Sequence, residues 1–527
     1  MKLAVIVDRL TLPRWAARAL AALEPGTQLV ILNCVNTPPS TKRLRNGLYY
    51  LLNILSVRNA ETRAVPVSQV PGVTEVVDFD AEADGNWQRL PDWLLDRLEA
   101  EAPTAIVKFG MHLLRVPGPE RLAVPILSYH HGDPEHFRGR PAGFYELLTG
   151  QPVMGQIVQI LSNRLDAGEI VAFAETKVHR HSYRATLVEA YRHSPLLLPV
   201  ALANAAVGRR LAKEPRGKNY RLPANGTVAS LAGRLALRKA ARLAYGAFFE
   251  KNWRVSTASL SADALLATPA TAIPAAGEWR NLPLPDGYRF IADPFFAPDG
   301  KGLIVEALRA ATARGEILLL DGGAPRRLSE AGAHFSYPGT VREGDADYLV
   351  PEMSDGSPQR VFRLSAADVE DCGELDLPGR PRLLDPTLWR GADGLFLFAN
   401  DAAEGPSVLR LWRSDGLFAP FREHPASPIL LSPAGGRMAG AILDLGIGLV
   451  RLGQDLRGDY GDGLLLHRID RLSREDYRET PFGAIRFTGL RGPHTLQLRD
   501  GLAAFDWYKN RFHPLAGLRR MKMSRIK

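Results

Sequence analysis

The chain has 527 residues, of which 46% are hydrophobic and 23% are charged, a composition typical of folded proteins that excludes a disordered one. Its two cysteines, Cys34 and Cys372, are too few for a disulfide framework; they favour a reducing compartment and exclude a zinc site built from cysteines. The net charge is +9, and residues 209–254 carry twelve Lys and Arg against two Glu, a surplus of ten that accounts for the imbalance. At about 150 residues per domain, the length predicts about three folded units.

The first ten residues, MKLAVIVDRL, are predicted to form a β-strand. Asp8 and Arg9 interrupt their apolar stretch, so the segment lacks the pattern of a signal peptide. The longest apolar run, residues 194–208, is shorter than the about 20 residues that span a bilayer and contains two prolines. No transmembrane helix is expected, and we predict a cytoplasmic protein, either free or peripheral at the inner membrane surface.

Residues 1–207 alternate apolar strand-like segments with helical ones. The strand-like segments are LAVIVD, QLVILN, AIVKFG and VPILSY, and the helical ones include residues 12–23 and 91–101. Two further strand-like runs, PVMGQIVQIL and EIVAFAETKV, precede a helical stretch over residues 187–211. This order predicts an α/β domain with a mostly parallel sheet and helices on both faces.

Residues 208–277 are predicted to form a basic helical connector and a linker. Arginines recur every fourth residue within the helical segment 227–252, a pattern typical of a connector helix with a solvated basic face. Contact of residues 209–254 with an anionic membrane surface is the alternative. Nucleic acid is not expected as a partner, because no RNA-binding or helix-turn-helix signature accompanies the charge. Residues 256–277 are rich in Ala, Ser, Thr and Pro, which marks a domain boundary.

Residues 278–527 contain one pattern five times: a start with Pro or Gly, a strand, a tight turn, a second strand and an acidic residue. The segments are IADPFFAPDGKGLIVEA, YPGTVREGDADYLVPEM, LDPTLWRGADGLFLFAND, MAGAILDLGIGLVRLGQD and GPHTLQLRDGLAAFDW. They begin roughly 45 to 55 residues apart, the length of one four-stranded blade, and three of their turns are Asp-Gly. An all-β five-bladed β-propeller is predicted, with a β-sandwich as the rival architecture.

The stretch from Ser128 to Pro141, SYHHGDPEHFRGRP, places histidines and an Arg-Gly turn directly after a predicted strand. With SNRLDAGEIV further on, it resembles the folate-dependent formyltransferase family, whose signature runs Asn-x-His, Arg-Gly-x-x-Pro and Asp-x-Gly-x-Ile. His130 and Asp166 occupy the family's histidine and aspartate positions. Because IVKFGMHLL also resembles the strand and loop that line the folate pocket, the resemblance implies 10-formyltetrahydrofolate as formyl donor. It implies that the cofactor is bound by Phe109, Gly110, Met111, Arg138 and Gly139.

Formyl transfer to an amine requires that the amine lose a proton and that an oxyanion be stabilised. An imidazole titrates near neutral pH, so the resemblance makes His130 the base, with Asp166 keeping it basic and oriented. Ser128 stands where the family has the asparagine that donates to the oxyanion; its hydroxyl is also a donor but is shorter. The neighbouring His112, His131 and Asp133 are interpreted as structural or substrate-facing. No compact set of ligands with metal-binding spacing is present, so no metal is expected.

The repeat motifs also carry a resemblance, to the propeller domain found beside glycosyltransferase modules in glucosamine inositolphosphorylceramide transferases. The resemblance covers about residues 278–520. More distantly, the same residues resemble five-bladed furanosidases, in which acidic residues converge on the propeller axis. It implies a polar axial funnel, which suits a sugar, formed by Asp293, Glu352, Asp385, Arg437, Gln454, Asp455 and His494. The order of the three acids differs from that of the hydrolases, which favours binding over hydrolysis.

Three functions follow. The first is an N-formyltransferase acting on an amine, an amino sugar or a glycoconjugate, with a propeller that recognises the saccharide or glycolipid. The second is a glycan-binding protein in which Ser128 has impaired formyl transfer. The third is a glycoside hydrolase or glycosyl-transfer enzyme that acts through the propeller funnel.

Overall fold

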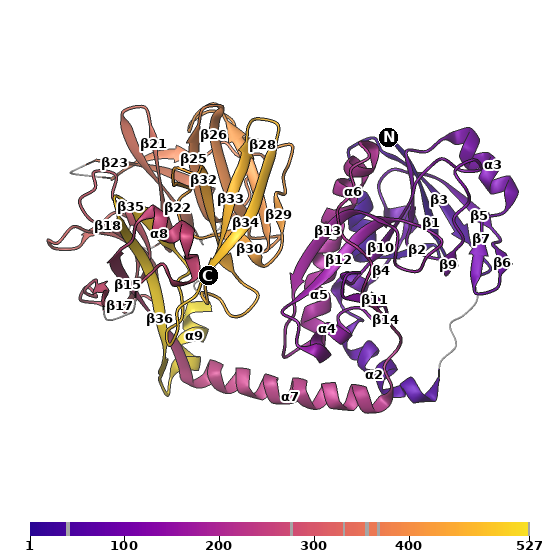
Figure 1. Ribbon diagram of the computed structural model, residues 1–527, viewed down its shortest axis with the longest axis horizontal. Coiled ribbons are helices and arrows are strands. Elements are labelled where there is room, and N and C mark those ends of the chain that lie inside the picture. The colour runs from indigo at the N-terminus through magenta and orange to yellow at the C-terminus, as the bar shows by residue number, and fades with distance from the viewer. Residues whose placement is uncertain (38–42, 275–277, 330–332, 354–357, 366–368, 525–527) are drawn as a thin grey trace. The chain divides into compact units, whose positions relative to one another are not determined.

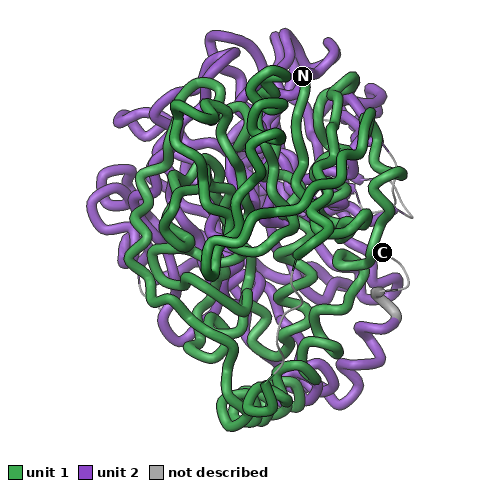
Figure 2. The backbone as a smooth tube through the Cα atoms, turned by 90° about the vertical axis from the view of Figure 1, so that its right-hand side faces the viewer, with its two compact units in different colours: residues 1–240 green, residues 241–527 purple. Residues whose placement is uncertain are grey.

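A computed structural model describes residues 1–37, 43–274, 278–329, 333–353, 358–365 and 369–524 (Figure 1). The chain forms two compact units, residues 1–240 and residues 241–527, which are coloured separately in Figure 2. The division falls within helix α7 (Asn225–Phe248), so the predicted connector 208–277 is shared between the two units. No helix within the described ranges is both long and apolar enough to cross a bilayer.

Unit 1 is built on a seven-stranded sheet with the order β13-β12-β10-β8-β1-β3-β5. Its strands are β1 (Lys2–Val7), β3 (Gln28–Cys34), β5 (Val73–Phe79), β8 (Ala105–Lys108), β10 (Ile126–His130), β12 (Val153–Ile160) and β13 (Glu169–Lys177). The first five are mutually parallel, whereas β12 and β13 pair antiparallel. The predicted mostly parallel sheet is confirmed.

Both faces of this sheet are covered. Successive residues of β1 point to opposite faces, and Leu3, Ala4, Val5 and Ile6 are all buried. Leu94 of α3 packs in the cluster that contains Ile6. The helices of unit 1 are α1 (Arg14–Ala21), α2 (Gly47–Ser56), α3 (Asp92–Glu101), α4 (Phe144–Thr149), α5 (Tyr183–His193), α6 (Leu197–Ala206) and the first part of α7.

Short strands of unit 1 form three further small sheets. They are β2 (Thr11–Pro13) with β4 (Ala64–Pro66), β6 (Glu82–Asp84) with β7 (Trp87–Arg89) and β9 (Leu113–Leu114), and β11 (Phe137–Gly139) with β14 (Lys218–Tyr220). The pair of β11 and β14 is parallel and fixes the loop that follows β10. This pairing brings Tyr220 to the Arg-Gly turn.

The described residues of unit 2 form five antiparallel sheets. The first joins both ends of the unit: β16 (Arg280–Asn281), β15 (Phe249–Ser259), β36 (Leu502–Phe512) and β35 (Leu496–Arg499). The second is β17 (Tyr288–Phe296), β18 (Leu303–Arg309), β19 (Gly315–Leu320) and β20 (Arg326–Arg327). The third is β21 (Phe335–Glu343), β22 (Ala346–Met353), β23 (Arg360–Leu364) and β24 (Val369–Glu374).

The remaining two sheets each have a short additional strand. One contains β25 (Leu383–Gly391), β26 (Gly394–Asp401), β27 (Val408–Ser414), β28 (Arg422–Glu423) and β29 (Leu430–Leu431). The other contains β30 (Ala434–Met438), β31 (Leu443–Asp444), β32 (Leu449–Asp455), β33 (Leu464–Leu472) and β34 (Tyr477–Ile485). Two short helices, α8 (Ala262–Ala267) and α9 (Ala516–Ser524), complete the unit.

Each predicted repeat forms the hairpin at the start of one sheet. The five hairpins are β17–β18, β21–β22, β25–β26, β30–β32 and β35–β36. The first strands of neighbouring sheets contact one another, β17 with β21 and β35, and β25 with β21 and β30. In the last hairpin Asp500 and Gly501 have φ of 49° and 75°, the positive values that a two-residue turn requires.

The predicted connector ends earlier than expected. The basic helix was predicted over residues 227–252, but α7 ends at Phe248 and is followed by strand β15 instead of helix and linker. β15 pairs with β36 over its whole length, from Phe249 opposite Phe512 to Ser259 opposite Leu502. Pairing with a strand some 250 residues later overrides the local helical pattern, because it buries Trp253 and Val255. Residues 275–277 of the predicted linker lie outside the described residues.

Candidate functional sites

The predicted histidine and aspartate meet in unit 1. His130 ends β10, and Asp166 lies in the turn between β12 and β13. Nδ1 of His130 is 3.5 Å from Oδ1 of Asp166, and the two side chains are 9% and 17% exposed. The second carboxylate oxygen of Asp166 accepts a hydrogen bond of 2.9 Å from the backbone N–H of Gly139. The Arg-Gly turn therefore positions the carboxylate that faces the imidazole.

Both ring nitrogens of His130 face acceptors. Nε2 lies 3.2 Å from the carbonyl oxygen of Phe137, and Nδ1 faces Asp166. A neutral imidazole has one N–H and can donate to only one of them, whereas an imidazolium can donate to both. The ring of His130 is thus held between the carbonyl oxygen of Phe137 and the carboxylate of Asp166.

A cavity of about 770 Å³ lies beside this pair. Asp166 is in its wall, together with Lys108 and the arginines Arg43, Arg45, Arg140 and Arg221. None of these four arginines forms an ion pair with a carboxylate in the described ranges. Apolar and aromatic side chains also line it: Tyr50, Met111, Leu113, Leu165, Tyr220 and Leu222. The cavity therefore combines apolar and aromatic surfaces with an excess of positive charge.

His130 itself does not line this cavity. It borders an adjacent void of about 10 Å³, and the two share Gly139, Arg140 and Tyr220 as walls. Asp166 lines the large cavity, whereas His130 borders only the small void.

The residues predicted to bind the cofactor are only partly brought together. Met111 and Gly139 line the large cavity, and Arg138 borders the small void. Arg138 donates hydrogen bonds to the carbonyl oxygens of Leu165 and Pro215, so it holds loops in place. The other two face away from the cavity: Phe109 stacks on Tyr129, and Gly110 is pressed against the end of β1, where a Cβ would lie 2.3 Å from the backbone nitrogen of Asp8.

The structure adds Lys108, which the sequence analysis did not select. In the parallel register of β8 and β10, Lys108 is the partner of Ser128, so their side chains project to the same face. Its ammonium donates to the carbonyl oxygen of Met111 at 3.3 Å. Burial lowers the pKa of Lys108 to about 8, although Asp8 and Asp166 oppose that shift. Ser128 does not line the cavity, whereas Lys108 does.

The remaining nearby candidates have structural environments. Nε2 of His131 lies 2.9 Å from the hydroxyl of Ser194, and its ring packs against Trp15 and Tyr191. Burial lowers the pKa of His131 to about 3, so this side chain is neutral. Asp133 is paired with Lys213 at 3.0 Å. His112 lies in the wall of the large cavity.

A second site lies in unit 2, around a cavity of about 430 Å³. The structure brings together five of the predicted funnel residues, of which four lie on strands of four different sheets and His494 lies in the loop before β35. They are Asp293, Glu352, Asp385, Arg437 and His494. Nε of Arg437 is 2.5 Å from Oδ2 of Asp385, and Nη2 is 2.9 Å from Oδ1 and 3.1 Å from Oε2 of Glu352. One guanidinium therefore bridges two carboxylates in the cavity wall.

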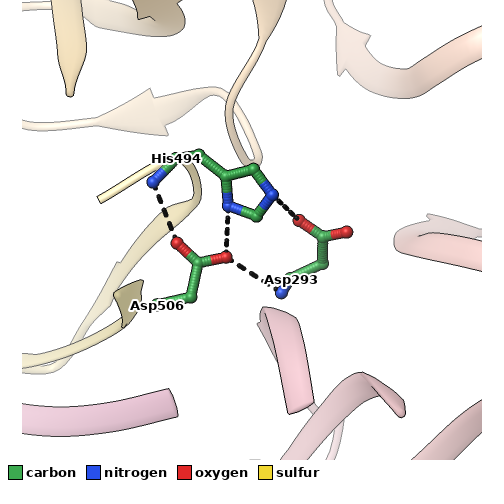
Figure 3. Close-up of side chains that lie close together, drawn as sticks. All are labelled: Asp293, His494 and Asp506. Atoms are coloured by element: carbon green, nitrogen blue, oxygen red, sulfur yellow. Dashed lines mark hydrogen bonds and ion pairs between the residues drawn. The ribbon is translucent and has the colours of Figure 1, made fainter. Parts of the chain in front are cut away.

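His494 lies between two carboxylates (Figure 3). Its Nδ1 pairs with Asp506, and its Nε2 is 3.5 Å from Oδ1 of Asp293. Asp506 also accepts backbone N–H bonds from Asp293, His494 and Thr495. Burial alone lowers the pKa of His494, but Asp506 and Asp293 outweigh it and raise the pKa above its ordinary value. The three residues form one fully buried chain of acid–base groups.

The carboxylates of this cavity differ in their surroundings. Burial raises the pKa of Glu352 to about 7, against the opposing charge of Arg437. Burial also raises the pKa of Asp293, against the charge of His494. Asp385 instead receives two hydrogen bonds from Arg437 and one of 2.7 Å from the amide of Gln454. Glu352 therefore has a pKa that suits a proton donor, and it lies beside a carboxyl group that accepts three hydrogen bonds.

Two predicted funnel residues do not line the cavity. Gln454 lies behind Asp385 and supports it. Asp455 is paired with Arg457 at 2.8 Å and with Arg486, away from the lining residues, because adjacent residues of β32 point to opposite faces. Asp506 was missed by the sequence analysis, although it is the acidic residue that ends the fifth repeat.

The group of Asp293, His494 and Asp506 also has the spacing of a metal site. One ligand atom from each lies within 4.8 Å of the others. The ion pairs that the three side chains form with one another account for this spacing without a metal ion.

Comparison with known proteins separates the two halves of the chain. The family model for the N-terminal part of glucosamine inositolphosphorylceramide transferase 1 matches residues 283–488, which confirms the resemblance of the repeat motifs over that range. The rice enzyme of that name (Oryza sativa subsp. japonica) is 33% identical over 218 residues, covering 38% of this chain and 29% of its own length. The Arabidopsis thaliana enzyme is 27% identical over 217 residues, covering 38% and 28%. The chain spans less than a third of these relatives.

Solved structures similar to this chain include formyltransferases. Glycinamide ribonucleotide transformylase 1 from Symbiobacterium toebii has 21% identity, with a TM-score of 0.27 over 41% of this chain and 92% of that one. The N-formyltransferase from Helicobacter canadensis, in complex with folinic acid and dTDP-3-aminofucose, has 12% identity. Its TM-score is 0.26 over 42% of this chain and 70% of that one.

Proposed function

We propose that unit 1 transfers a formyl group from 10-formyltetrahydrofolate to an amine, carried by an amino sugar or a glycoconjugate. The observation that carries this proposal is the 3.5 Å approach of His130 to Asp166, with Asp166 in the wall of a cavity of about 770 Å³. A paired imidazole and carboxylate can take up the proton that the attacking amine must lose.

The cavity fits the proposed donor. Folates combine a flat ring system with glutamate carboxylates, and the cavity offers the rings of Tyr50 and Tyr220 together with four arginines. Its volume lies within the about 300–1,000 Å³ usual for ligand pockets. When bound, the donor supplies an electrophilic formyl carbon. The chain supplies the groups that orient the donor and accept a proton.

Lys108 provides the charge that the transition state needs. An oxyanion forms as the amine attacks, and preorganised donors aimed at it lower the barrier. Ser128 replaces the amide donor of the family signature, but the ammonium of its register partner Lys108 reaches the cavity. We assign Lys108 as the oxyanion donor and the pair of His130 and Asp166 as the proton acceptor.

Release of tetrahydrofolate tests this function. The purified chain is incubated with 10-formyltetrahydrofolate and a panel of amino sugars, and His130→Gln is compared with His136→Gln, a control at an exposed histidine of the same loop. We expect release with at least one amine, a loss of about 100-fold or more in His130→Gln, and no change in the control. No release with any amine would refute the proposal and favour the alternative of an impaired, glycan-binding protein.

We also propose that the five sheets of unit 2 are the blades of a β-propeller whose axial cavity binds a saccharide. The support is that side chains from all five sheets converge on one polar cavity. The name of the similar rice and Arabidopsis enzymes refers to a ceramide lipid, which favours a glycolipid as the ligand.

Cleavage of a glycosidic bond in unit 2 remains the alternative. It is favoured by Glu352, whose pKa of about 7 suits a proton donor, beside Asp385, which accepts two hydrogen bonds from Arg437. Binding of glycans to the wild type and to Glu352→Gln, followed by analysis of released sugar, separates the two. Retained binding without any released sugar supports recognition; release that depends on Glu352 supports hydrolysis.

A further inference from the structure

Helix α2 of unit 1 presents an apolar face to solvent. Leucines recur at positions 44, 48, 51 and 55, a spacing that places them on one side of the helical segment. With Ile54 they form what we call the outer stripe. Their exposed fractions are 95% for Leu44, 41% for Leu48, 54% for Leu51, 51% for Ile54 and 62% for Leu55.

The opposite face of α2 is apolar as well and accounts for the folding of the helix. Tyr49 is buried in a cluster with Phe144 and Tyr183, and Leu52 packs against the same cluster. A surface helix ordinarily turns polar residues to solvent, and single exposed leucines are common, but a continuous apolar stripe marks an interaction site. The outer stripe is therefore not needed for the core of unit 1.

The charges around the outer stripe identify the partner. No acidic residue occurs between Glu24 and Glu61, whereas Arg43, Arg45 and Arg58 flank the stripe and are exposed. The first turn of α2 is tied to α7, since the N–H of Leu48 donates to Oδ1 of Asn225 at 2.9 Å. Helix α7 also lacks acidic residues and carries four cations, Arg234, Arg238, Lys239 and Arg242.

We propose that the outer stripe docks the chain onto an anionic membrane surface. Leucines that enter the interface of a bilayer, with arginines reaching to lipid phosphates, are the pattern of a helix lying in the membrane plane. A second copy of the chain fits less well, because a two-fold pairing of stripes would bring the flanking arginines of both copies together.

Docking through α2 would place the unit 1 cavity at the lipid surface. Arg43, Arg45, Asn46 and Tyr50 line that cavity and belong to the same segment as the stripe. An acceptor amine carried on a lipid headgroup then reaches the cavity without leaving the membrane. This consequence rests on the proposed formyl transfer, whereas the docking itself does not.

Vesicle co-sedimentation of the full chain tests the docking. The probes are vesicles of phosphatidylcholine alone and of phosphatidylcholine with about one quarter phosphatidylglycerol. The variant Leu51→Gln/Leu55→Gln removes two members of the stripe without touching the cavity, and Val207→Gln is the control at an exposed apolar residue of α6's end. We expect binding to anionic vesicles only, weakened at least about tenfold in the double variant and unchanged in the control.

Each outcome decides the proposal. Binding that survives the double substitution, or no sedimentation of the wild type with anionic vesicles, overturns it. A wild-type dimer that the double substitution converts to monomer, measured by light scattering, would assign the stripe to a second copy and also overturn it. Formyl transfer to a soluble amine by a chain that does not bind vesicles would refute docking alone; vesicle binding without formyl transfer would refute the proposed activity alone.

Discussion

Substitution of Lys108 by methionine should change stability and activity in opposite directions. It therefore separates a chemical role of Lys108 from a purely structural one. Methionine keeps the length and much of the apolar stem of the side chain but removes its charge. Burial lowers the pKa of Lys108 to about 8, below the ordinary lysine value of 10.5, so the folded environment disfavours the ammonium. At about 1.36 kcal/mol per pKa unit, this difference corresponds to about 3 kcal/mol of destabilisation.

The sign follows from proton binding. Below pH 8 Lys108 is protonated in both the folded and the unfolded state, and the full destabilisation is present. Between pH 8 and 10.5 only the unfolded state keeps the proton, so the free energy of unfolding rises with pH. Because Lys108 faces the cavity and stays partly exposed, water reduces the cost, and we expect about 2 kcal/mol. Lys108→Met should therefore raise the free energy of unfolding of unit 1 at pH 7, measured by urea denaturation.

Activity should change in the other direction. Loss of one oxyanion donor costs about 10² to 10³ in kcat, so Lys108→Met should be less active although more stable. The wild-type rate should fall as the pH rises above about 8, where the ammonium loses its proton, and this descending limb should be absent in the variant. A variant that keeps its wild-type kcat, or that loses activity and stability together, would refute the assignment of Lys108.

Two predictions concern unit 2. Arg437→Met leaves Asp385 and Glu352 close together without their shared cation, which should lower the stability of the unit by about 3–5 kcal/mol in thermal unfolding; a loss below about 1 kcal/mol would contradict the bridge. The pKa of His494 is raised in the folded state, so its charged form contributes stability below the unfolded value of about 6.5 that is lost as the pH rises through the folded value. His494→Gln should remove this fall in Tm above about pH 6.5, and a profile of Tm against pH that the substitution leaves unchanged would contradict the raised pKa of His494.

The structural features that could be predicted from the sequence depend on patterns within a single segment. The apolar strands around LAVIVD indicated a parallel sheet, and the five repeats mark the hairpins that begin the five sheets. The approach of His130 to Asp166 was indicated by the family resemblance, which fixes a relation between distant residues that no local pattern carries.

The structural features that the sequence did not predict depend on pairing between distant segments. Strand β15 was taken for helix and linker because its partner β36 lies at the other end of the unit. The proposed role of Lys108 as oxyanion donor follows only from the register of β8 with β10, which places Lys108 beside Ser128. Asp455 and Asp506 both end a repeat, yet only Asp506 joins the acid–base chain around His494; the repeat alone does not distinguish them.

Calorimetric titration of the full chain with folinic acid, a stable formyl-folate, tests the central claim most directly. The cavity around Asp166, with its four arginines, predicts saturable binding of one folate per chain. That binding should weaken at least about tenfold when Arg221 is replaced by Met, because one of the cations facing the folate carboxylates is lost. Absence of any binding heat at every temperature tried, with the protein folded, would contradict the assignment of unit 1 as a folate-dependent formyltransferase.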